Sequence, residues 1–341
     1  MDNFYSSRLH GFPNLSRGSG SMESALSEQG ILSLLIVLGS SVSLVGLVFA
    51  FITYSLFSDL RNLSGTALMN LLAAMFMTQL LYVVGVGGIV DPDLCISLAF
   101  SLQYVRLCIL CWLLVIVHHM YRQFNLHIHT LIPRPELSIS RTFLGYSLFA
   151  WGLPAVLLFI SIIIEYEDKS IDLILRNTNE TVKHNCWFLD NKSFYICYLV
   201  PCCICFLCTV WYMLCAIVAV YRAVTIQLDR KVRSRMLKKR RMQIFLFFKI
   251  TIIIYGIVVL GALYRQEDNE YTKISFHVTQ GLQGIIVAML VTCNCQVLKL
   301  YSKSIKVNKR KLPKMYGVDK KELNKSTSMQ LLTWQSPPDI V

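Results

Sequence analysis

The stretch LCISLAFSLQYVRLCILCWLLVIVHHMYR, which runs from Leu94 to Arg122, decides the fold of this chain. It is apolar almost throughout, and its 28 residues from Leu94 to Tyr121 exceed the roughly 20 that a helix needs to cross a bilayer. A single charge, Arg106, interrupts it. Because a charged group at membrane depth is costly, Arg106 should face a helix bundle or a watery cavity. The stretch therefore predicts a central helix surrounded by protein, and it leaves open whether Arg106 binds a ligand or is only paired locally.

Six other stretches are also long and apolar enough to span a membrane. The chain has 341 residues, of which 55% are hydrophobic and 16% charged, too apolar for an ordinary soluble domain. The predicted spans are about Ile31–Phe57, Thr66–Gly88, Leu94–Tyr121, Thr142–Ile164, Phe194–Val224, Ile244–Tyr264 and Ile274–Leu298. We expect an all-α membrane protein: a short extracellular tail (residues 1–29), a seven-transmembrane helix bundle (30–301) and a cytoplasmic tail (302–341).

The basic residues predict the orientation of this bundle. Of 33 Lys and Arg, eight lie in Arg230–Arg241 and ten between Lys299 and Lys325. Because loops rich in Lys and Arg stay in the cytoplasm, the C-terminus is predicted inside and the N-terminus outside. Topology and attraction to anionic membrane lipid account for the net charge of +13, so no nucleic-acid partner is expected. Met1–Gln29, rich in Ser, Gly and Asn, is predicted to be disordered.

Two cysteines, Cys95 and Cys186, lie at the predicted outer face, which is oxidising. We expect a disulfide between them that holds the loop Glu165–Asn191 over the mouth of the bundle, with Cys197 as the one rival partner. The same face carries three Asn-x-Ser/Thr patterns, which predict N-glycosylation at Asn14, Asn179 and Asn191.

No motif in the sequence predicts an enzyme, a metal site or a cofactor. Nucleotide-binding loops, hydrolytic triads and paired carboxylates are absent from the sequence. The cysteines of Cys202–Cys208 lie inside a predicted membrane helix without a nearby histidine, so packing is favoured over zinc. His118 and His119 are adjacent and point in different directions on a helix, which favours polar contacts over a shared metal. Asp and Glu are rare in the spans, which disfavours an ion-coupled transporter.

Several residues within the spans predict how the helices pack. The first span is rich in small residues, which let helices approach closely: Gly39, Ser40, Ser41, Ser43 and Gly46. In the second span, Asn70 and Gln79 should face inward, because lipid offers them no partner. Pro154 should kink the fourth span.

Four stretches resemble the secretin/adhesion class of G-protein-coupled receptors and, within it, the Methuselah-like receptors. Leu60–Gly65 (LRNLSG) resembles the opening of the family's second span, and Tyr146–Pro154 (YSLFAWGLP) resembles its fourth-span signature. Cys186-Trp187-Phe188 resembles its outer-loop motif, and the stretch led by Gln283-Gly284 resembles its seventh span. The resemblance covers about residues 30–301. It implies a plasma-membrane receptor that transmits an extracellular signal to a heterotrimeric G protein.

Three departures from the family pattern bear on that implication. Ser64 stands where the family has histidine, Ile116 where a glutamate is usual, and the sixth span lacks its usual tryptophan near Tyr255-Gly256. The family's polar lock therefore cannot be transferred residue by residue. A non-signalling or decoy seven-helix protein remains an alternative, as does a transporter or channel.

The resemblance also implies two sets of functional residues. A pocket for an unknown peptide or protein ligand is expected from the third, sixth and seventh spans and the outer loop: Gln103, Tyr104, Arg106, Trp187, Tyr264 and Gln283. Contacts with the G protein are expected, besides the basic loop, from Arg61, Tyr121, Arg122, Arg222 and Lys249.

The last four residues, Pro338-Asp339-Ile340-Val341, allow two interpretations. A free carboxylate after an apolar residue suits capture in the groove of a PDZ protein. The alternative is an unstructured end that binds nothing.

Overall fold

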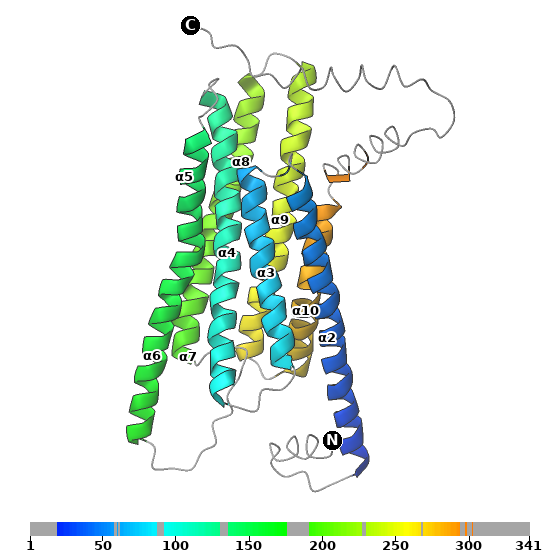
Figure 1. Cartoon of the computed structure of the whole chain (residues 1–341), viewed down its shortest axis with the longest axis vertical. Helices are drawn as coiled ribbons and strands as arrows, with labels where there is room; N and C mark the ends of the chain where they lie inside the picture. The colour runs from blue at the N-terminus through cyan, green and yellow to red at the C-terminus, as the bar shows by residue number, and fades with distance from the viewer. Residues whose placement is uncertain are drawn as a thin grey trace, which may run out of the picture. The chain divides into compact units, whose positions relative to one another are not determined.

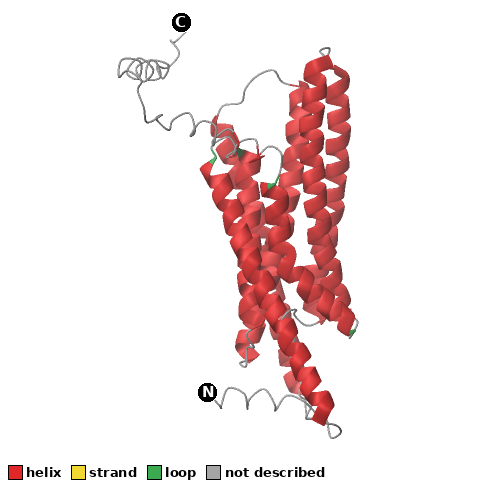
Figure 2. Cartoon of the chain, turned by 90° about the vertical axis from the view of Figure 1, so that its right-hand side faces the viewer, coloured by secondary structure: helices red, strands yellow, loops and turns green. Residues whose placement is uncertain are grey.

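Seven helical segments of the chain are long and apolar enough to cross a membrane (Figure 1). The structure is a computed structural model that describes residues 19–57, 60, 62–86, 92–129, 136–175, 191–226, 230–266, 269–293, 297–298 and 302. None of these residues lies in a β-strand, and Figure 2 shows helices throughout. The prediction of an all-α, seven-helix bundle is confirmed.

Each predicted span corresponds to a helical segment, but several of these segments are longer than predicted. Five spans are single helices: α2 (Ser19–Leu56), α3 (Leu63–Val86), α4 (Pro92–His129), α9 (Arg230–Gln266) and α10 (Glu270–Thr292). The fourth span is built from α5 (Glu136–Ser147), η2 (Leu148–Gly152) and α6 (Leu153–Leu175). The fifth is built from α7 (Asn191–Phe194), η3 (Tyr195–Leu199) and α8 (Val200–Ile226). α6 continues eleven residues past Ile164 into the predicted outer loop, and α9 begins fourteen residues before Ile244 and includes the basic run.

The first helix begins earlier than the sequence predicted. Residues up to Gln29 were expected to be disordered, whereas α2 begins at Ser19. Met22, Glu23, Ala25 and Leu26 are good helix formers. Because extending an existing helix needs no new nucleus, the membrane-spanning part can propagate helix into a segment that has no amphipathic period of its own.

Both multi-part spans contain a π-helical turn just before a proline. η2 precedes Pro154, and η3 precedes Pro201. Proline has no N–H to donate to the carbonyl four residues earlier, here that of Ala150 or Cys197. Each of those carbonyls lies within the π turn, so the wider turn accommodates the missing bond. The backbone irregularity predicted at Pro154 is therefore spread over the turn that precedes it.

α4 is the central helix, as its sequence predicted. Its apolar window is 78% buried, against 50% for α3 and α10 and 17% for the fourth span. Every residue from Val105 to Leu113 is buried. α4 packs against α3, α8 and the fourth span, so nearly all of its faces meet protein. Arg106 is only 8% exposed and lies inside the bundle.

α2 and α10 pack with their backbones close together. A Cβ added at Gly284 would lie 2.7 Å from the Cβ of Ser43 and 2.8 Å from Leu47. A Cβ added at Gly46 would lie 2.8 Å from Ile285. These residues, together with Ser40 and Gly281, are called the α2–α10 seam below. The small residues of the first span allow the close approach that the sequence predicted.

A serine hydroxyl joins the two helices of this seam. Ser43 donates to the carbonyl of Gly281 at 2.6 Å and accepts from the amide of Ile285 at 3.1 Å. These two backbone groups are four residues apart and would bond each other in a regular α-helix. Ser43 of α2 is therefore hydrogen-bonded to both members of one backbone pair of α10. This gives the buried hydroxyl the partners that lipid could not offer.

Candidate functional site

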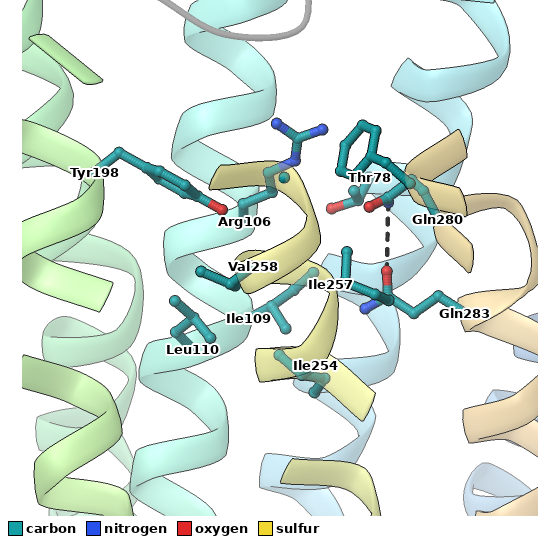
Figure 3. Close-up of a pocket in the computed structure, with 12 residues that line it drawn as sticks. Thr78, Arg106, Ile109, Leu110, Tyr198, Ile254, Ile257, Val258, Gln280 and Gln283 are labelled. Atoms are coloured by element: carbon teal, nitrogen blue, oxygen red, sulfur yellow. Dashed lines mark hydrogen bonds between the residues drawn. The ribbon is translucent and has the colours of Figure 1, made fainter. Parts of the chain in front are cut away.

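A small cavity lies within the bundle, between α3, α4, η3, α9 and α10 (Figure 3). Its volume is about 20 Å³, enough for about one water molecule. It is lined by Thr78, Arg106, Ile109, Leu110, Tyr198, Ile254, Ile257, Val258, Gly261, Phe276, Gln280 and Gln283. The lining thus combines apolar side chains, mostly from α9, with polar ones from the other helices. Ligand pockets in proteins commonly have this composition.

Arg106 is the one charged side chain among these lining residues. Its guanidinium carbon lies 5.9 Å from the centre of the Phe276 ring, within range of a cation–π interaction. Figure 3 shows the Tyr198 hydroxyl directed toward Arg106. The sequence expectation that Arg106 faces the bundle interior is confirmed.

Buried polar contacts join α3 to α10 beside the cavity. The Gln79 amide donates to the carbonyl of Gln280 at 2.6 Å, and the Gln280 amide donates to Gln283 at 3.3 Å. The Tyr82 hydroxyl is hydrogen-bonded to Nδ1 of His277. The inward orientation predicted for Gln79 is confirmed. Asn70, in contrast, is half-buried and donates to the carbonyl of Thr66 in its own helix.

Sequence reasoning missed His277, Gln280, Thr78 and Tyr198 as residues of this region. A signal for part of this set was available. His277, Gln280 and Gln283 recur every three residues, which places them on one face of a helix. Three polar side chains on one face of a membrane span require a protein-facing position.

The six predicted pocket residues divide into four groups. Arg106 and Gln283 line the cavity. Tyr264 stacks on the lining residue Phe276, with ring centres 5.4 Å apart. Trp187 lies outside the described residues, and Gln103 and Tyr104 lie elsewhere.

Gln103 and Tyr104 face the fourth span and do not line the cavity. The Gln103 amide donates to the Ser161 hydroxyl at 2.7 Å, and the Tyr104 hydroxyl donates to the carbonyl of Trp151 at 3.4 Å. They were expected in the pocket as residues of the third span, which the resemblance implied would line it. Since protein surrounds α4 on nearly all sides, a polar residue there can find its partner on any neighbouring span.

The predicted disulfide is only partly within the described residues. Cys95 is disulfide-bonded, and Cys197, the rival partner, is a free thiol. Cys186 lies outside the described residues, so its pairing with Cys95 stays a prediction. Asn14, Asn179 and the side chain of Asn191 also fall outside them.

The opposite end of the bundle, here called the Arg122 end, carries aromatic and basic side chains. The rings of Tyr121 and Tyr212 lie 5.9 Å apart, and His118 lies 4.9 Å from Tyr212. His118 is also hydrogen-bonded to the Tyr146 hydroxyl at 3.2 Å, which confirms a polar contact for this histidine. Arg122 is exposed at the end of α4.

The other predicted G-protein contacts are placed differently. Arg222 is exposed near the end of α8, and Arg61 lies outside the described residues. Lys249 does not lie at the Arg122 end. It is twelve residues into its span, about 18 Å along the helix from Leu237. Its side chain is exposed, and the ammonium lies 4.5 Å from the Phe245 ring of the same helix. A long lysine stem can reach toward the membrane surface from such a position.

Two cysteines of α8 pack as small side chains inside the bundle. Cys202 and Cys205 are buried, and the Cys205 thiol is hydrogen-bonded to that of Cys111 on α4. Among the described residues, no group of three or more His, Cys, Asp or Glu could hold a metal ion. The site therefore consists of aliphatic, aromatic and polar side chains around a cavity.

Comparison with known proteins identifies the bundle. Residues 30–287 match the family described as "7 transmembrane receptor (Secretin family)". The chain belongs to this secretin family of receptors. The family consists of seven-helix receptors, so the chain is a multi-pass protein of the plasma membrane and not an enzyme.

The chain is similar to several receptors of this family. It is 28% identical to human "Adhesion G-protein coupled receptor G4" over 233 residues, which cover 66% of this chain and 7% of that protein. It is 32% identical to mouse "Cadherin EGF LAG seven-pass G-type receptor 1" over 116 residues, 34% of this chain and 4% of that protein.

It is also 26% identical to "G-protein coupled receptor Mth" of Drosophila yakuba over 278 residues, 77% of this chain and 51% of that protein. The chain thus spans a small part of the length of the first two relatives and about half of the third. The resemblance to the secretin/adhesion class and to Methuselah-like receptors is confirmed.

Proposed function

We propose that this receptor transmits the binding of an extracellular ligand to a heterotrimeric G protein. In this proposal the Cys95 end of the bundle faces outward and the Arg122 end faces the cytoplasm. Supporting this orientation, Arg122 and Arg222 are exposed at one end and the basic run Arg230–Arg241 begins α9 there. Cytoplasmic segments are rich in such residues.

The main observation that supports the proposal is that α3, α4 and α10 all line the cavity. α4 contributes Arg106 to this cavity and continues to Arg122, so one helix connects the two ends of the bundle. The cavity of about 20 Å³ is far smaller than the roughly 300–1,000 Å³ of ordinary ligand pockets. A ligand that reaches Arg106 and Gln283 therefore has to move the surrounding helices apart, and so favours another arrangement of the bundle.

Thermodynamic linkage would connect binding of the ligand to binding of the G protein. If a G protein binds the arrangement that the ligand favours, each partner raises the affinity for the other by the same factor. The ligand is proposed to be a peptide or protein that contacts Arg106 and Gln283, with Tyr264 stacked behind Phe276. A contact between the ligand and Trp187 is part of the same proposal. The proposed Cys95–Cys186 disulfide would fix the loop that carries Trp187.

One observation favours a second candidate, a receptor that binds without signalling. Ile116 is fully buried, and the resemblance drawn from the sequence places it where a glutamate is expected. The polar switch of those relatives is therefore not built from the same residues in this chain. A transporter finds less support, because the lining residues that the structure describes include no Asp or Glu.

A test in cells separates the first two candidates. The full chain is expressed with each class of Gα subunit, and resonance energy transfer reports dissociation of Gα from Gβγ. We expect basal dissociation above that of mock-transfected cells for at least one class. Arg122→Glu should reduce this signal at equal surface expression, whereas Lys273→Glu, an exposed charge reversal on α10, should not. No signal above mock for any class would favour the non-signalling receptor.

A further inference from the structure

We propose that one side of α9 binds an anionic phospholipid in the leaflet at the Arg122 end, with the lipid phosphate at Lys249 and the headgroup beside Arg241. The proposal assigns a lipid site on the outside of the bundle, away from the cavity. It requires only that the bundle spans a membrane, so its test does not depend on G-protein coupling.

One side of α9 is exposed along most of the membrane-spanning segment. The exposed residues recur there at helical spacing: Arg241, Phe245, Phe248, Lys249, Ile252, Gly256 and Val259. At 3.6 residues per turn, these positions fall within roughly a third of the circumference of the helix. They are called the α9 lipid face below. Because α9 is long and apolar enough to cross the membrane, lipid is the neighbour of this face.

Lys249 contributes a cation to the α9 lipid face close to the membrane surface. The apolar part of α9 begins at Ile244, and five residues of helix place Lys249 only about 7.5 Å deeper. The ammonium lies 4.5 Å from the centre of the Phe245 ring, which is one turn nearer to Arg241. The lysine stem therefore runs back toward the surface, where the lipid phosphates of that leaflet lie.

Arg241 supplies a second cation on the same face. It is exposed, and it precedes Lys249 by eight residues, about 12 Å along the helix, which corresponds to the level of the lipid headgroups. From Arg230 to Gln266 the sequence of α9 contains no Asp or Glu, so neither cation has an acidic neighbour on its own helix. A phospholipid with net negative charge is therefore favoured over a zwitterionic one, whose ammonium these cations repel.

The deeper part of the α9 lipid face suits an acyl chain. It consists of Ile252, Gly256 and Val259, all of which are exposed. Nothing lies within 4 Å of a Cβ added at Gly256, so there is open space beside the helix at this glycine. An acyl chain can occupy that space while its phosphate is at Lys249. A soluble anion would have no contact with this part of the face.

The test is native mass spectrometry of the purified full chain in detergent. Dioleoyl phosphatidylglycerol or dioleoyl phosphatidylcholine is titrated in, and the dissociation constant of the first bound lipid is measured. We expect phosphatidylglycerol to bind about fivefold more tightly or better, the factor expected for one cation near the membrane surface. Equal dissociation constants for the two lipids would overturn the proposal.

A soluble headgroup tests whether the occupant is a lipid. Glycerophosphoglycerol has the headgroup of phosphatidylglycerol and no acyl chains. We expect that it does not displace the bound lipid at equal concentration, because it cannot contact Ile252, Gly256 and Val259. Displacement would show that the site recognises the phosphate alone and would overturn a phospholipid as its occupant.

Three variants locate the site, and each replaces an exposed side chain, so folding should be unaffected. Lys249→Gln should lower the preference for phosphatidylglycerol about fivefold, and Arg241→Gln should lower it by a smaller factor. Lys239→Gln is the matched control, because Lys239 is exposed on the same helix but lies about 80° around it from Lys249, away from Arg241. It should leave the preference unchanged. An equal loss in Lys239→Gln and Lys249→Gln would show diffuse attraction to a basic helix end and would contradict the proposal.

Discussion

On its side toward α2, helix α10 is held through glycine and serine, whereas toward α3 and α4 it is held by long polar side chains around a cavity. In the α2–α10 seam, Gly284 lies so close to Ser43 that no side chain fits between the helices. Beside the cavity, Gln79 and Gln280 join α3 to α10 through a flexible side chain. The backbones of α2 and α10 are therefore in close contact along the seam, whereas α3 is joined to α10 through side chains. This difference suits a receptor in which a ligand moves some helices relative to a fixed pair.

The largest effect is expected at Gly284. Gly284→Val adds side-chain atoms where a Cβ alone would lie 2.7 Å from Ser43. Because that neighbour is held close to its backbone, the helices must separate, at a cost of about 3 kcal/mol or more. We expect a large loss of surface expression, measured by flow cytometry. Gly256→Val is the matched control, because nothing lies within 4 Å of a Cβ at that exposed glycine. An equal loss of surface expression in both variants would show that the close packing at Gly284 does not explain the effect.

A smaller effect is expected from the hydroxyl of Ser43. Ser43→Ala removes the group between the Gly281 carbonyl and the Ile285 amide. The cost should be about 1–2 kcal/mol, because buried backbone groups lose a partner and recover it only in part. The measurement is the unfolding midpoint of the purified receptor.

The control for this variant lies two residues away. The Ser41 hydroxyl is exposed and donates to the carbonyl of Val37 in its own helix. Ser41→Ala should therefore leave the midpoint unchanged. A larger drop for Ser41→Ala than for Ser43→Ala would refute the role of Ser43 as a bridge.

The smallest effect is expected on the cavity side. Gln79→Leu removes the bond to the Gln280 carbonyl, and interhelical hydrogen bonds in membranes contribute about 0.6 kcal/mol on average. Asn70→Leu, which removes a bond within α3 alone, is the control. If Gln79→Leu lowers the unfolding midpoint more than Ser43→Ala does, the two sides of α10 do not differ in the way described.

Sequence alone could predict the central helix, and the reason is the single charge at Arg106. A cation in a long apolar stretch requires protein around it, and α4 is the most buried span. The same argument fails for Lys249, because a flexible lysine can lie on an exposed face and run along its own helix. The number of charges in a span therefore does not show which way each one points.

The partners of polar residues on the central helix could not be predicted either. Gln103 is three residues from Arg106, yet it bonds Ser161 of the fourth span. Which span a side chain contacts depends on the relative rotation of seven helices, and no local sequence pattern encodes that rotation.

The π turns before Pro154 and Pro201 could not be predicted from the sequence either. The prolines predict an irregular backbone, and the tertiary contacts decide its form.

The most direct test of the central claim is guanine-nucleotide exchange on a purified heterotrimeric G protein. The full chain in nanodiscs is mixed with trimers of each Gα class, and binding of a labelled, non-hydrolysable GTP analogue is followed over time. The account predicts faster exchange with at least one class than with empty nanodiscs, reduced by Arg122→Glu. Exchange equal to that of empty nanodiscs with every class would contradict it.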